Sequence, residues 1–172
     1  MSPAGAYEAI RTALTDSHTG WEEVLADFDS ANRSFAQGVV SSLVALTGGD
    51  FEYLQSNLVG SGRTHAASVF VFTRTRIVAV EAVQAQPRVI SSVHPRSAVR
   101  SMSVHDLEAD YREHGRGLTD VRFNVVVEGR SRGLLLAVHK PTTRLDAQPQ
   151  QRARLLALFQ SLLVHVDDMN VR

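Results

Sequence analysis

The chain has 172 residues, of which 44% are hydrophobic and 21% charged, with no formal net charge at pH 7, as expected of one globular domain or of one domain with an extension. The absence of cysteine excludes disulfide bonds, thiolate metal ligands and a cysteine nucleophile. The first ten residues, MSPAGAYEAI, lack a signal-peptide pattern and no apolar run approaches the ~20 residues that span a bilayer, so we expect a cytoplasmic location.

The first 48 residues have the apolar spacing of helices. A short helix is predicted over residues 3–15, and Thr19-Gly20-Trp21-Glu22 has the form of a capping box at the start of a second. We expect this second helix to run to Leu46, or to break near Asn32–Ser34. Gly48-Gly49 is a suitable stop, because glycine adopts the left-handed cap conformation without penalty.

After Gly49 the apolar period changes to two. Val69–Phe72 and Ile77–Val80 flank the polar turn Thr73–Arg76, which predicts a β-hairpin. Seven strands are predicted in all: Phe51–Val59, Ala66–Thr73, Arg76–Val83, Arg88–His94, Ala98–Val104, Val121–Val127 and Leu134–His139. The charged segment 105–120 is predicted to be a loop or short helix. A last amphipathic helix is predicted from about 146–149 to Val166.

Seven strands followed by one amphipathic helix resemble the pleckstrin-homology-like superfold, especially its small bacterial members. VFVFTRTRIVAVEA is similar to the strand–Thr-x-x-Arg–strand hairpin of those domains, with Thr73 and Arg76 in the motif. VISSVHPRSAVRSMSV is similar to their two short strands broken at a proline, and RFNVVVEGRSRGLLLAVH to their final hairpin. The resemblance covers about residues 50–166. It implies that residues 50–172 form a seven-stranded antiparallel barrel closed by the C-terminal helix. The helical hairpin predicted at residues 1–48 lies outside the resemblance, and together the two parts make an α+β fold.

In that superfold three loops crowd the barrel end opposite the helix, where ligands commonly bind. Here those loops contain one carboxylate, Glu128, and a set of basic residues: Arg63, His65, Arg88, Arg130 and Arg132. Converging guanidinium groups suit a small anionic ligand or an acidic lipid headgroup, although phosphoinositide-binding members have a denser basic motif. The alternative is that exposed turns simply contain arginine. These loops have no aromatic residue to stack on a base, which argues against nucleic acid.

The sequence contains no recognisable catalytic or metal motif. His105–His114 is rich in potential ligands, yet it lacks the His-Glu-x-x-His spacing and the calcium-loop pattern, which favours a solvated loop. There is no Gly-x-Ser-x-Gly nucleophile elbow and no glycine loop long enough to hold a dinucleotide. We therefore predict no enzyme, no metal and no cofactor.

Two features favour self-association. Residues 1–60 contain eight carboxylates and two arginines, a net −6, so the rest of the neutral chain has +6. The apolar stripe that begins at Trp21 must be covered by the barrel, by the first helix or by another copy. The leading hypothesis is a non-enzymatic protein-interaction or scaffolding module that self-associates through four residues of this stripe: Trp21, Phe28, Phe35 and Val39. Alternatively, the stripe is covered within one chain and the charges are solvated surface.

The patterns also predict which side chains form the core. These are Phe70 or Val71, Val78, Phe123, Val125, Leu136, Phe159 and Leu163.

Overall fold

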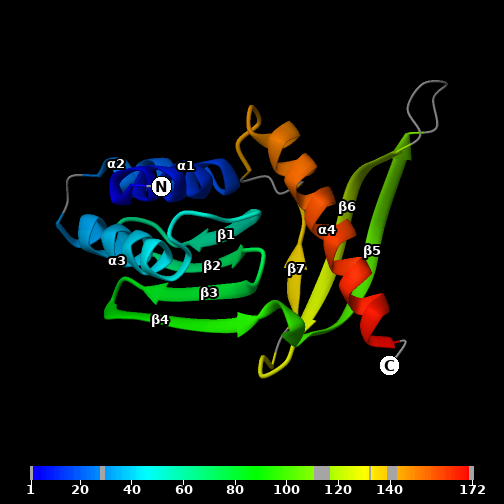
Figure 1. The fold of residues 1–172 in the computed structure, drawn as a ribbon. Helices are drawn as coiled ribbons and strands as arrows, with labels where there is room; N and C mark the ends of the chain where they lie inside the picture. The colour runs from blue at the N-terminus through cyan, green and yellow to red at the C-terminus, as the bar shows by residue number, and fades with distance from the viewer. Residues whose placement is uncertain (1, 28–29, 111–116, 132, 139–142, 171–172) are drawn as a thin grey trace.

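The computed structural model describes residues 2–27, 30–110, 117–131, 133–138 and 143–170. This described part is an α+β fold with two antiparallel sheets, ordered β1-β2-β3-β4 and β5-β6-β7 (Figure 1). The strands are β1 (Tyr53–Val59), β2 (Ala66–Phe72), β3 (Arg76–Val83), β4 (Gln86–Pro95), β5 (Val99–Asp110), β6 (Gly117–Val127) and β7 (Leu134–Leu136). The predicted closed barrel is wrong, because no strand pair among these residues joins the two sheets. A 3₁₀ turn at Arg96–Ala98 instead directs the chain out of the first sheet.

The predicted β2–β3 hairpin is confirmed. The Thr73 hydroxyl oxygen accepts from the backbone N–H of Arg76 at 2.9 Å, which closes the turn. The prediction of a loop or short helix over 105–120 is wrong for the described residues, where β5 continues to Asp110 and β6 begins at Gly117. The outer part of this pair projects from the body as a ribbon (Figure 1), so residues 105–110 and 117–120 need not show the apolar alternation that marks a covered strand.

Three helices precede the strands: α1 (Pro3–Ser17), α2 (Gly20–Ala26) and α3 (Ser30–Thr47). The chain breaks at Asp27, which is extended, and not near Asn32–Ser34, which lies within α3. The predicted capping box does not form, since Thr19 has helical dihedrals and makes no side-chain cap bond. The adjacent buried His18 supplies the cap, and its Nδ1 accepts from the Gly20 N–H at 3.1 Å.

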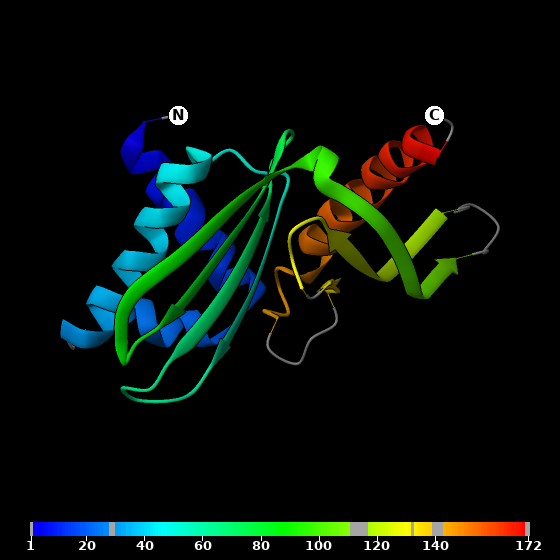
Figure 2. The same cartoon turned by 90° about the horizontal axis from the view of Figure 1, so that it is seen from below.

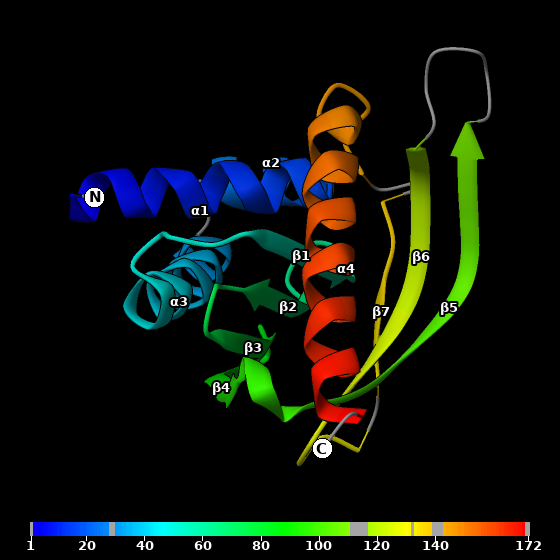
Figure 3. The same cartoon turned by 45° about the vertical axis from the view of Figure 1, so that its right-hand side comes forward.

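The three N-terminal helices cover one face of the first sheet (Figures 1 and 3). Their apolar side chains and those of β1, β2 and β3 form one core, which includes Leu14, Trp21, Val39, Val69, Val71, Val78 and Val80. Trp21, Phe35 and Val39 were expected at a contact between copies, but here they are buried within the single chain. The sheet face needs such a cover, and the stripe provides it. Phe28 lies outside the described residues.

The last helix, α4 (Gln148–Asn170), packs against both sheets in a second core (Figure 3). This core joins Tyr53, Phe72 and Ile77 of the first sheet to the second sheet and to Leu155, Leu158, Phe159 and Leu162 of α4. The predicted core is confirmed at Val71, Val78, Phe123, Val125, Leu136 and Phe159. Leu163 is 38% exposed, however, because the buried face of α4 passes through Leu162. No helix in the described ranges has the length and hydropathy to cross a bilayer.

Candidate functional site: the edge strand β4

The edge strand β4 pairs with β3 alone among the described strands. Opposed residues of an antiparallel pair share a face, so Val89, Ser91 and Val93 lie on the helix-covered face with their partners Ala82, Val80 and Val78. The alternate residues Ile90, Ser92 and His94 lie on the other face. Ile90 is 66% exposed and Val93 is 44% exposed. Seen from below (Figure 2), β4 crosses in front of the first sheet with no described element drawn over it.

The other sheet edges in the described structure are covered, short or charged. At the β1 edge the Gln55 amide group donates to the Leu135 carbonyl at 2.7 Å and accepts from the Ala137 N–H at 3.0 Å, so it bridges to the second sheet. β7 has only three residues, and β5 carries charges such as Arg100 and Asp106 and has three register irregularities. Such features discourage strand addition. The central segment of β4, VISSVH, contains no Lys, Arg, Asp or Glu.

A groove of about 300 Å³ lies between α3 and β4 on the helix-covered face. Its lining is largely apolar and comprises Ala31, Ser34, Phe35, Gly38, Ala82, Val83, Gln84, Gln86, Arg88 and Val89. The helix approaches the strand closely at Gly38, where a Cβ atom would lie 3.1 Å from Cγ2 of Val89. The side of α3 that faces β4 therefore has small residues, and Phe35 forms the apolar wall of the groove.

A second, polar groove of about 450 Å³ borders β4 on the opposite face. Its lining includes Arg130, from the turn between β6 and β7, together with Glu81, Ser92 and His94. The Arg130 guanidinium lies 5.2 Å from the ring centroid of Phe70, and its Nη2 is 3.3 Å from a Glu81 carboxylate oxygen. Nη1 donates to the Ser92 hydroxyl at 3.4 Å, whereas the buried Nε has no hydrogen-bond partner. Arg130 is thus held in place by three contacts, and its Nε–H has no partner.

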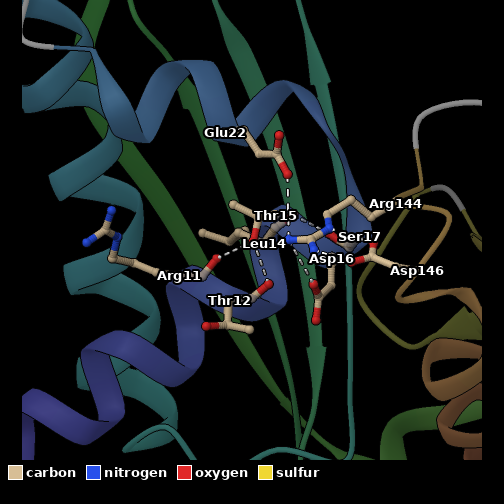
Figure 4. A network of polar contacts seen from close by, with 9 residues as sticks. All are labelled: Arg11, Thr12, Leu14, Thr15, Asp16, Ser17, Glu22, Arg144 and Asp146. Carbon is tan, nitrogen blue, oxygen red and sulfur yellow. Dashed lines mark hydrogen bonds and ion pairs between the residues drawn. The ribbon is translucent and has the colours of Figure 1, made fainter.

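A network around Arg144 ties α1 and α2 to the segment before α4 (Figure 4). The guanidinium lies 3.9 Å from Asp16 and 3.6 Å from Glu22, and it donates to Asp146. Burial raises the pKa of Asp16, although Arg144 opposes the shift. The hydrogen bond from Arg144 lowers the pKa of Asp146. These contacts join the helical layer to the segment that precedes α4.

The structure disperses the basic residues that were expected to converge. Arg63 lies exposed in the loop between β1 and β2, and Arg88 borders the groove beside α3. Arg130 borders the polar groove on the other face. His65 is buried, with its ring 6.2 Å from an α3 phenylalanine ring, and Arg132 lies outside the described residues. The four described residues therefore do not form one anion-binding end, and among them Arg130 lines the polar groove.

Charge clusters elsewhere in the described chain do not form a metal site. No three His, Asp or Glu side chains among the described residues lie close enough together to hold an ion. Residues 111–116 of the ligand-rich segment lie outside those residues. Burial raises the pKa of Tyr53 well above its ordinary value, but this phenol lies within the second core.

Comparisons with family models, curated proteins and solved structures give no match to this chain. Its role must therefore follow from its own geometry. Sequence reasoning missed β4 as a site, although the sequence contains a signal for it. Pro87 and Pro95 flank the strand, and proline within a sheet is typical of an edge strand, while the six residues from Val89 to His94 contain no Lys, Arg, Asp or Glu to block pairing.

Proposed function

We propose that this protein is a non-enzymatic interaction module that binds another polypeptide along β4 as an added antiparallel strand. One observation carries the proposal: β4 is ten residues long and its outer edge meets no other described strand. An edge of this kind presents unpaired backbone N–H and C=O groups to an extended chain. The exposed Ile90 and Val93, one on each face, would supply the side-chain selectivity.

The order of the elements supports kinship with the pleckstrin-homology-like superfold. Four strands, three strands and one amphipathic helix follow one another in the chain, although the two sheets are not closed into a barrel. Many members of that superfold bind proteins or oligomerise, so the kinship favours binding over catalysis. Because fold alone does not determine function, the proposal is based on the exposed edge of β4.

The test is a selection of ten-residue peptides displayed on phage. The full chain is the target, and the double variant Ile90→Lys/Val93→Lys is used for counter-selection, because edge lysines block strand addition. We expect enriched peptides with alternating apolar residues that lose at least tenfold in affinity for this variant. The control is Val59→Lys/Val104→Lys, which charges two exposed strand residues outside β4. Peptides that bind all three proteins equally would refute the proposal.

A second candidate function is capture of a small anion in the polar groove. The observation that favours it is the unpartnered Nε of Arg130 beside a groove large enough for a phosphate group. Glu81 already neutralises part of this charge, which places this function second. Pyrophosphate and phosphatidylglycerol vesicles would distinguish a free anion from a lipid headgroup. Binding of either that is unchanged in Arg130→Ser would eliminate this candidate.

A further inference from the structure

We infer that the strand added to β4 is β4 of a second copy, paired antiparallel about a two-fold axis at Ser91. This inference rests on the proposed function and names its partner. The two first sheets would then form one continuous sheet of eight strands across the dimer. The axis stands perpendicular to the sheet, so the helix-covered faces of both copies lie on the same side.

The side chains of β4 select this register. A two-fold axis perpendicular to the sheet leaves the helix-covered faces of both copies on the same side. Opposed side chains must point to the same face, so the axis can pass only through a position where a residue lies opposite the same residue of the second copy. With the axis at Ser91, Val89 lies opposite Val93 of the second copy, and the symmetric pair repeats this contact. Shifting the axis to Ile90 or to Ser92 keeps the strands paired but sets each of these valines opposite serine or proline. The Ser91 register is therefore the one that buries both valines against an apolar partner.

The charges near β4 permit this pairing. The segment VISSVH has no ionised acid, lysine or arginine, so no like charges face each other across its length. Arg88 lies at one end and meets His94 of the second copy at the edge of the contact. The β5 edge, by contrast, contains charged residues such as Arg100 and Asp106 and has three register irregularities, which discourage strand addition. Self-pairing thus suits β4 better than the other long edge.

The position of α3 adds a second contact between the copies. This helix packs on both β3 and β4. Strands lie about 4.8 Å apart, so two α3 helices related by the axis would lie two strand spacings apart, ~10 Å, a normal distance for packed helices. The side of α3 facing the second copy has Ala31, Ser34 and Gly38, whose small side chains permit that approach. The groove beside α3 is then the space that the second α3 fills.

Single cysteines test the register directly, because the natural chain contains none. Under mild oxidation Ser91→Cys should form a disulfide-linked dimer at least tenfold faster than Ile90→Cys or Ser92→Cys. Opposed Cβ atoms in a strand pair lie about 4.5–5.5 Å apart, close to disulfide geometry. Ser97→Cys, exposed in the turn after β4, is the control and should form no disulfide-linked dimer. Faster linkage at position 90 or 92 would overturn the register.

Sedimentation equilibrium of the full chain tests the dimer itself. We expect a mass that approaches twice the 18.8 kDa of one chain as concentration rises. Ile90→Lys/Val93→Lys and Ser34→Arg should each weaken dimerisation at least tenfold, whereas Val59→Lys/Val104→Lys should not, with circular dichroism checking the fold of each. A wild-type chain that stays monomeric at several hundred micromolar would overturn this inference. If selected peptides still bind β4 in that case, the proposed function survives; if they do not, both fail.

Discussion

Phe159→Ala should destabilise the protein by about 3–5 kcal/mol, because α4 holds the second core together through this ring. Phe159 is only 2% exposed, and its ring centroid lies 5.0 Å from that of Phe123 in a tilted arrangement. Loss of the buried ring removes roughly 1.5–3 kcal/mol of transfer free energy, and loss of the aromatic pair a further ~0.5–1.5 kcal/mol. The remaining cost comes from the cavity that the neighbouring side chains do not fill.

Urea denaturation followed by circular dichroism measures this change. At an unchanged slope, the free energy of unfolding should fall by the stated amount and the melting temperature by roughly 6–20 °C. Leu163→Ala is the matched control on the same helix, and it should cost less than about 1 kcal/mol since Leu163 is partly exposed. An effect of Phe159→Ala below about 1 kcal/mol would show that α4 does not close the second core.

Further predictions concern the polar groups of the helical layer. The Ser56 hydroxyl accepts from the Trp21 indole N–H at 3.0 Å, so Ser56→Ala leaves a buried donor unpaired and should cost about 1–3 kcal/mol in urea unfolding. Burial raises the pKa of Asp16 above 3.8, so the folded state binds this proton more tightly than the unfolded state does. The free energy of unfolding therefore falls as pH rises from 3.8 through the raised pKa. The urea midpoint of Asp16→Asn should accordingly increase relative to that of the wild type from roughly pH 3 to pH 7. The hydrogen bond from Arg144 lowers the pKa of Asp146, so the stability contributed by the ionised Asp146 is lost as pH falls below 3.8. Asp146→Asn should therefore have a lower urea midpoint than the wild type at about pH 7 but not at about pH 2. Shifts of the same sign in both aspartate variants would contradict these assignments.

Local patterns predicted the local structure. The β2–β3 hairpin follows from two apolar runs around Thr73–Arg76, since both the strands and the turn are determined by neighbouring residues. The helix break was misplaced because the apolar periodicity runs through Asp27, whereas the backbone there is extended and ends α2. The capping box failed because His18, next in the chain, offered a competing acceptor.

Features that depend on contacts between distant parts of the chain could not be predicted from the sequence. Alternation predicts strands but not which strands pair, so one barrel and two separate sheets have almost the same pattern. The same limit explains the basic residues: Arg88 and Arg130 were placed together on a common barrel end, yet the first sheet sets them at different grooves. Likewise β4 became a candidate site only when the structure showed which strand lies at an uncovered edge.

Salt distinguishes strand pairing from attraction between oppositely charged segments. The −6 and +6 segments already meet within one chain, where Arg144 contacts Asp16 and Glu22, and Arg96 binds Glu52 at 2.5 Å. A dimer formed through the neutral edge of β4 should change its dissociation constant less than twofold from about 50 to 500 mM NaCl, across which the screening length falls roughly threefold. Sedimentation equilibrium at both salt concentrations measures this. Weakening of tenfold or more in high salt would mean that complementary charge, and not the β4 edge, joins the two copies.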